Sequence, residues 1–197
     1  MNNFFNTTDA VAGDVCKNSI SGDIMAISGK FVAQCFDKDG NLKWEDGIIN
    51  TVTDEGKKFA LDALFGATFS SVYMGLISSV GWSAINGVTD NAAGINGANG
   101  WKEAGSGSNF PIFANRGTPS FSSAAKATTV DKSTSSAVSF SIITTGGTLK
   151  GAIIVINGTS AIGNTTGKLY SAGLFQGGDK VVAVSDTINV SYTTSIS

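Results

Sequence analysis

The sequence predicts an all-β protein, an antiparallel β-sandwich that contains one short α-helix. Several short segments alternate apolar and polar residues, clusters of Gly, Asn and Asp separate these segments, and a single segment has apolar residues at helical spacing. Strands spaced this closely are typical of packed antiparallel sheets, and a jelly roll is one arrangement that fits. The 197 residues are expected to form one compact domain with an appended arm.

The first part of the chain is expected to be this arm. Residues 1–27 mix Asn, Thr, Asp and Gly with isolated apolar residues and show no period of 2 or 3.6. An N-terminal arm or irregular lead-in over 1–27 therefore precedes a single β-sandwich domain over 28–197. Phe4 and Phe5 are candidate partner-binding residues in the arm.

A β-hairpin is expected at the start of the domain. Residues 28–36 and 42–50 are rich in strand-forming residues, and the sequence Asp-Lys-Asp-Gly-Asn at 37–41 separates them. This turn sequence superficially resembles a calcium-binding loop, but its Gly stands fourth instead of sixth and Lys43 falls inside. A hairpin turn explains these residues better.

One α-helix is expected over about residues 53–65. Thr51 or Thr53 can cap it, and Asp54 and Glu55 complement the positive end of the helix dipole. The apolar residues at helical spacing predict the face that packs against the core. They are Phe59, Ala60, Ala63 and Leu64.

A long loop rich in Gly, Asn and Ser is expected over about residues 81–117, and loops of this length are usually functional. Its aromatic residues Trp82, Trp101, Phe110 and Phe113 are candidate partner-binding residues. The Trp rings could also serve as sugar-stacking platforms or as core and interface anchors, and the anchor role is favoured. Further strands are expected at about 71–78, 138–142, 149–156, 169–175 and 188–196.

The composition excludes several classes of function. The chain has no His, which removes Ser-His-Asp triads and HExxH metal sites. A net charge of −2 with one Arg argues against nucleic acid as a partner, and no apolar run approaches the roughly 20 residues that span a bilayer. The glycine clusters match no nucleotide-binding motif, so no nucleotide cofactor is expected. Without His, and without the spacing of a calcium loop at 37–45, no metal is expected either. Cys16 and Cys35 permit one disulfide, and two buried thiols are the simpler interpretation.

Two parts of the chain resemble virion proteins of tailed bacteriophages. The first contains the sequence Asn-Thr-Val-Thr-Asp-Glu-Gly at 50–56 and continues through Leu-Asp-Ala-Leu-Phe at 61–65; the second runs from Gly167 to Thr193. The resemblance covers roughly residues 30–80 and 135–197. It is closest to capsid decoration, or cement, proteins, and it supplies no catalytic residue.

This resemblance implies a non-enzymatic structural protein of the viral head. Such a protein would be made in the host cytoplasm and lie on the capsid surface as a homo-oligomer, binding the major capsid protein and copies of itself. The alternative is a tail fibre, adaptor or host-glycan-binding module, which Trp82 and Trp101 favour. A polysaccharide depolymerase that uses carboxylates such as Asp90 and Glu103 is the third interpretation.

Overall fold

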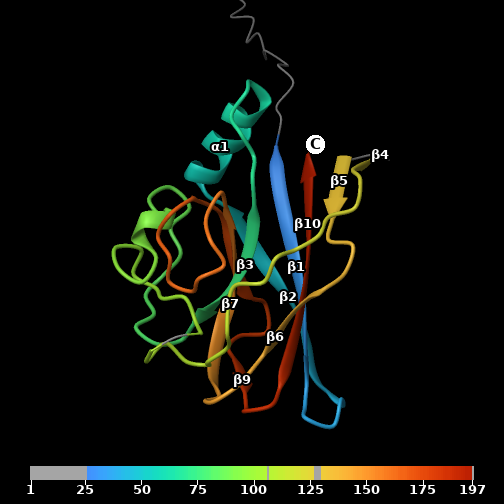
Figure 1. The fold of residues 1–197 in the computed structure, drawn as a ribbon, viewed down its shortest axis with the longest axis vertical. Helices are drawn as coiled ribbons and strands as arrows, with labels where there is room; N and C mark the ends of the chain where they lie inside the picture. Colours follow the sequence, from blue (N-terminus) through green and yellow to red (C-terminus); the bar gives the residue numbers. More distant parts are fainter. Residues whose placement is uncertain (1–25, 106, 127–129, 197) are drawn as a thin grey trace, which may run out of the picture.

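A computed structural model describes residues 26–105, 107–126 and 130–196 and contains ten β-strands, one α-helix and one turn of 3₁₀-helix within those ranges (Figure 1). The helix α1 spans Asp54–Leu64 and the 3₁₀ turn spans Ala92–Gly94. The strands are β1 (Ile27–Phe36), β2 (Leu42–Val52), β3 (Val72–Ser78), β4 (Ala125–Lys126), β5 (Val130–Ser133), β6 (Val138–Ser141), β7 (Gly147–Ile156), β8 (Lys168–Phe175), β9 (Lys180–Val182) and β10 (Thr187–Ile196).

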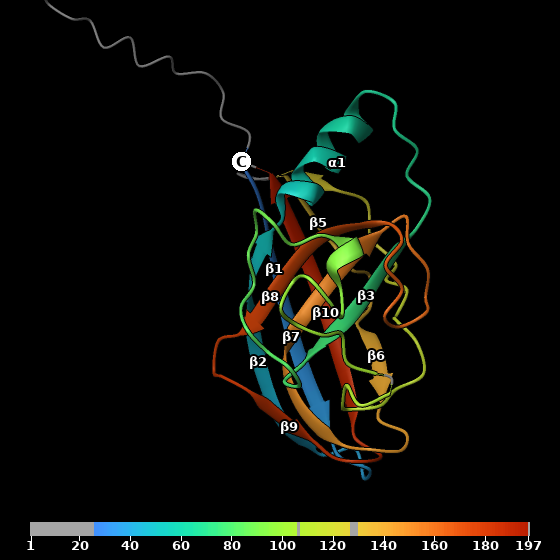
Figure 2. The same cartoon turned by 90° about the vertical axis from the view of Figure 1, so that its left-hand side faces the viewer.

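All ten strands belong to one curled antiparallel sheet that forms a half-barrel (Figures 1 and 2). The strand order is β3-β7-β8-β2-β1-β10-β5-β4, with β6 also pairing β10 and β9 pairing β7. The predicted all-β, sandwich-like class with one helix is confirmed. The fold resembles a sandwich because the twisted sheet curls until its two ends face each other. The concave face of the sheet then encloses the core.

The predicted hairpin is formed by β1 and β2, with Phe31 opposite Ile48. The turn is held by Asp37, whose Oδ1 accepts hydrogen bonds from the backbone N–H of Asp39 at 2.9 Å and of Asn41 at 2.8 Å. Bonds from the side chain and backbone of Asn41 lower the pKa of the Asp37 carboxyl. Gly40 takes a φ of 82°, which this turn requires.

Helix α1 begins after Thr53, one of the two caps that the sequence predicted. The backbone N–H of Gly56 donates to Thr53 Oγ1 at 3.0 Å, and Glu55 Oε2 accepts from the backbone N–H of Leu169 at 2.7 Å. Gly56 lets the helix lie directly on β8, because a Cβ at this position would lie 2.3 Å from the carbonyl oxygen of Tyr170. The helix therefore covers the upper end of the sheet (Figure 2).

Two groups of buried apolar side chains occupy the two faces of the sheet. The first lies inside the curl and includes Phe31, Ile48, Met74, Ile154, Ile188 and Tyr192. The second lies between strands β3, β7 and β8 and the segment that follows β3, and includes Ile77, Ile153, Leu169, Ile95 and Trp101. Strand β7 is buried on both faces, which explains its nearly continuous apolar sequence.

The segment predicted as a long loop over 81–117 is a packed layer on the outer face of the sheet (Figure 2). It carries the 3₁₀ turn, and isolated bridges join Ile77 to Glu103 and Met74 to Gly117. Edge strand β3 is therefore covered on its free side. Of the arm expected over 1–27, residues 1–25 lie outside the described residues, and Ile27 already belongs to β1.

Candidate interaction surface

Of the six predicted partner-binding residues, the structure describes four. Phe4 and Phe5 lie outside the described residues. Trp101 is 1% exposed and Phe113 is 2% exposed, so neither presents its ring to a partner, and the expectation is corrected for both. Both are core residues because the segment that carries them folds onto the sheet. Trp82 and Phe110 remain partly exposed, and partner binding through them stays a prediction.

The indole N–H of the buried Trp101 is hydrogen-bonded to a buried carboxylate. Trp101 Nε1 donates to Asp90 Oδ2 at 2.8 Å, and the backbone N–H of Asn86 donates to the same oxygen at 2.9 Å. Trp101 therefore acts as a core anchor, the role that the sequence favours for it. Asp90 and Glu103, the carboxylates of the depolymerase interpretation, are both buried, and Glu103 pairs with Arg116 inside the same layer.

Cys35 lies in β1 and is a buried free thiol. Burial, together with the nearby carboxylate of Asp186, raises the pKa of this thiol to about 12. Lys43 Nζ donates to Asp186 Oδ2 at 2.5 Å, and this hydrogen bond raises the pKa of the lysine. Cys16, the other half of the disulfide that the sequence permits, lies outside the described residues.

The last turns of α1 present an apolar stripe to solvent, which we call the helix stripe. Leu61 is 53% exposed, Leu64 65% and Phe65, the residue after the helix, 84%. The spacing i, i+3, i+4 places all three on one side of the helix. Leu64 was predicted to pack against the core, and this prediction is wrong, because Phe59, Ala60 and Ala63 face the sheet instead.

Leu61 and Phe65 were not predicted from the sequence as candidate functional residues. Their spacing from Leu64 was the available signal. The helix has apolar residues on two sides, and packing against one sheet can bury only one of these sides. Apolar residues that cluster on a surface mark sites of interaction with other proteins. The helix stripe is therefore the candidate functional site that the described residues define most clearly.

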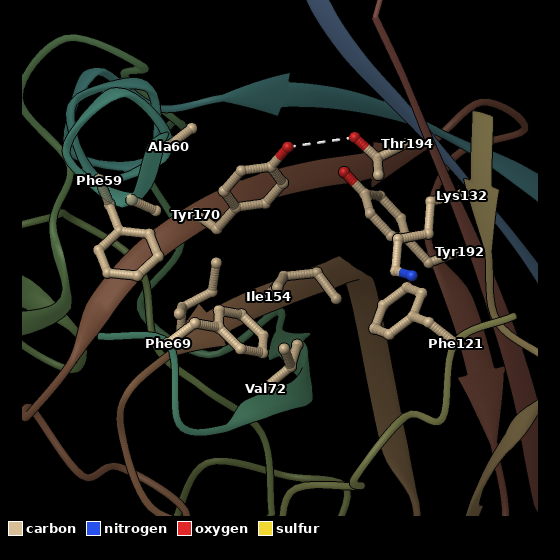
Figure 3. Close-up of a pocket in the computed structure, with 12 residues that line it drawn as sticks. Phe59, Ala60, Phe69, Val72, Phe121, Lys132, Ile154, Tyr170, Tyr192 and Thr194 are labelled. Atoms are coloured by element: carbon tan, nitrogen blue, oxygen red, sulfur yellow. Dashed lines mark hydrogen bonds between the residues drawn. The ribbon is translucent and has the colours of Figure 1, made fainter. Parts of the chain in front are cut away.

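Behind the helix stripe, a cavity opens between α1 and the end of the curled sheet, which we call the end cavity (Figure 3). Its volume is about 250 Å³. It is lined by Phe59, Ala60, Ala63, Phe69, Val72, Phe121, Lys132, Ile154, Ile156, Tyr170, Tyr192 and Thr194. Nearly all of this lining is apolar, so the cavity suits an apolar group.

The polar atoms at the end cavity are bonded within its wall. Tyr170 Oη and Thr194 Oγ1 form a hydrogen bond of 3.1 Å (Figure 3), and Asn50 Nδ2 donates to Tyr192 Oη at 3.3 Å. Burial raises the pKa of both tyrosines, so they are neutral phenols at neutral pH. Lys132 Nζ donates to the carbonyl oxygen of Ser122 at 2.8 Å. The wall therefore holds no ionised group that is left without a partner.

A second hollow, the Trp82 groove, lies on the outer face of β2 and β8. It has a volume of about 580 Å³ and is lined by Ile49, Thr51, Trp82, Ser83, Ala84, Ile85, Gly173, Leu174, Phe175 and Gln176. An aromatic ring such as that of Trp82 beside hydroxyl and amide groups is a combination that binds sugars. The ammonium of Lys150 lies 5.4 Å from the centre of the Trp82 ring.

Among the described residues, no group of three or more His, Cys, Asp or Glu side chains could hold a metal ion. Over the same part of the chain, no helix has the length and apolar character to cross a membrane. No protein-family model, no curated protein and no solved structure matches the chain.

Proposed function

We propose that this chain is a non-enzymatic structural protein of a tailed-phage virion, a capsid decoration protein that binds between major capsid subunits. The observation that carries the proposal is the helix stripe, an exposed apolar surface at the end of α1. Its three residues fall within 61–65, one of the segments that resembles phage virion proteins. The resemblance and the surface therefore point to the same part of the molecule.

The energetics of the helix stripe suit adhesion. Fully burying a Leu or Phe side chain contributes about 1.5–3 kcal/mol, and the stripe offers three such side chains on one short helix. Large apolar side chains at the centre of an interface usually dominate its affinity. A homo-oligomer that engages several neighbouring capsid sites at once gains avidity, so a modest affinity at each contact suffices.

The composition of the chain supports the same proposal. Charged residues make up 14% of the sequence, and the net charge is −2. Many copies packed closely on a shell would therefore accumulate little like-charge repulsion. Short Ser, Thr and Asn side chains also lose little rotamer entropy when an interface orders them.

Imaging of purified virions by cryo-electron microscopy tests the proposal. We expect density that fits the curled sheet and α1 on the head, at the junctions between capsomers, and a copy number in the hundreds by quantitative mass spectrometry. Copies confined to the tail, or a dozen or fewer copies per particle, would refute a decoration role.

A second candidate function, a tail module that binds host glycans, is favoured by the Trp82 groove. The groove places Trp82 beside Thr51, Ser83 and Gln176. A glycan array with the wild-type protein and Trp82→Ala tests it, and binding that the variant loses supports this candidate. Gln176→Ala is the companion variant, because it changes a polar group of the same groove.

Trp101→Ala is unsuitable as a glycan-binding variant. Its ring is buried and bonded to Asp90, so a loss of binding in this variant would report unfolding of the layer. A loss of sugar binding in Trp82→Ala or Gln176→Ala therefore counts only if the Tm of the variant matches that of the wild type. Wild-type protein that binds no sugar on the array would remove the glycan-binding candidate.

A further inference from the structure

The end cavity is large for a space whose lining is almost entirely apolar. An engineered cavity of about 150 Å³ lined by Leu, Ile and Phe binds benzene, and the end cavity has a volume of about 250 Å³. An aromatic side chain therefore fits into it. Side-chain atoms that line an empty cavity have no atoms to pack against on that side and so lose dispersion contacts. A group that fills the cavity restores these contacts and stabilises the fold.

The described chain begins beside this cavity. Ala26 and Ile27 line one hollow together with Lys57 and Leu61 of α1, and Ile27 pairs with Ile196 at the end of β10. Thr194, which lines the cavity, pairs with Gly29, three residues from Ala26. Ala26 is thus within about 10 Å of the cavity wall along an extended strand.

The preceding segment carries a suitable aromatic pair. Phe4 and Phe5 are the only aromatic residues in 1–25, and residues 6–25 connect them to Ala26. A chain of that length has a root-mean-square span of about 25 Å, and its extended length is greater still. A connection of 20 residues is therefore long enough for the pair to reach the cavity of its own molecule.

We propose that Phe4 and Phe5 of the N-terminal segment occupy the end cavity of the same chain. One ring packs among Phe69, Phe121 and Tyr192, where edge-to-face aromatic contacts are available. A covalent connection of this length supplies an effective concentration near the millimolar range, which favours the molecule's own segment over that of another copy. This inference is independent of the proposed virion function.

Thermal unfolding with benzene as the probe tests this proposal on the full-length chain. In the wild type, benzene should raise Tm little, because the cavity is filled. Phe4→Ala/Phe5→Ala should lower Tm and bind benzene at least about tenfold more tightly, because the intramolecular competitor is gone. Val11→Ala/Val15→Ala removes apolar groups from the same segment and is the matched control, with wild-type Tm and benzene response.

A filled cavity provides an independent check. Ala60→Leu adds apolar volume at a lining position of α1, where Leu is a good helix former. Combined with the double Phe variant, it should restore most of the lost Tm and abolish the benzene response.

Two results would overturn the proposal. One is a double Phe variant with the Tm and benzene affinity of the wild type. The other is a stabilisation by Phe4 and Phe5 that grows over about two decades of protein concentration, because the segment of a second copy would then fill the cavity.

Discussion

Glu103 and Arg116 form an ion pair in which both side chains are 0% exposed. Arg116 Nε donates to Glu103 Oε1 at 2.7 Å and Nη2 donates to Oε2 at 2.8 Å, so the contact is bidentate. Arg116 also donates to the carbonyl oxygens of Thr159 and Asn164, and Glu103 Oε2 accepts from the backbone N–H of Gly163. The single arginine of the chain thus ties the layer over β3 to the loop between β7 and β8.

Removing one partner of this pair should be strongly destabilising. We expect Arg116→Met to lower the free energy of unfolding by about 3–5 kcal/mol, because Glu103 would remain as a buried charge without its partner. Urea unfolding followed by circular dichroism measures this loss. Lys58→Met breaks the exposed pair with Asp62 and is the control, with an expected loss of about 0.5 kcal/mol or less. Equal losses of stability in the two variants would contradict the burial of the Glu103–Arg116 pair.

Gly56→Ala should destabilise the protein although alanine is the better helix former. In an exposed helix this change gains about 1 kcal/mol. Here the new Cβ would lie 2.3 Å from the carbonyl oxygen and 2.7 Å from the Cα of Tyr170, both backbone atoms that cannot rotate away. We expect a net loss of about 1–3 kcal/mol in urea unfolding, since α1 must move off β8. A gain in stability would show that the helix does not lie this close to the sheet.

Acid should destabilise the protein partly through Asp46. Burial alone would raise the pKa of this carboxyl, but the ammonium of Lys180 at 2.8 Å and the backbone N–H of Gly177 hold it below its ordinary value of 3.8. A carboxyl with a lowered pKa in the folded state stabilises the fold above its unfolded pKa, and this contribution disappears as the pH falls through the folded pKa. Stability should therefore decline as the pH falls from about 5 to below 3.8.

Urea unfolding at a series of pH values checks the role of Asp46. Asp46→Asn should be less stable than the wild type at pH 7 and should lose less stability on acidification, because it has no proton to take up. Lys180→Met should also weaken the dependence of stability on acid pH, because the ammonium that lowers the pKa of Asp46 is gone. An unchanged acid dependence in Asp46→Asn would mean that other carboxyls account for it.

The helix stripe should be required for attachment and not for folding. Leu64→Ser/Phe65→Ser changes two exposed side chains, so the free energy of unfolding should stay within about 0.5 kcal/mol of the wild type. Under the proposed function, the variant should fail to co-sediment with undecorated capsids that bind the wild type. Val181→Ser, an exposed apolar residue of β9 at the opposite end of the molecule, is the matched control (Figure 1). Retained binding in the helix variant would exclude the helix stripe as the contact.

The elements that the sequence predicted well are those specified by neighbouring residues. Thr53 caps α1 and Gly40 occupies a left-handed turn position because backbone geometry and local hydrogen bonds require these residue types. The alternation along 188–196 likewise predicted β10, in which Ile188, Val190 and Tyr192 face the core.

The errors arose where contacts between distant segments decide burial. Leu64 and Phe59 look equivalent along the helix, but the direction from which β8 approaches Gly56 decides which of the two is buried. In the same way, a glycine-rich segment with Trp101 looks like an open loop until strands β3, β7 and β8 supply a second apolar face for it to cover.

The sequence by itself thus determined the all-β class, the hairpin, the helix and its cap, because periodicity and turn chemistry act over a few residues. Only the tertiary structure decided that one sheet curls into a half-barrel, that Arg116 closes over Glu103, and that Leu61, Leu64 and Phe65 stay in solvent. These features depend on which faces meet across the chain. A buried face and an exposed face made of the same residue types differ only in what packs against them.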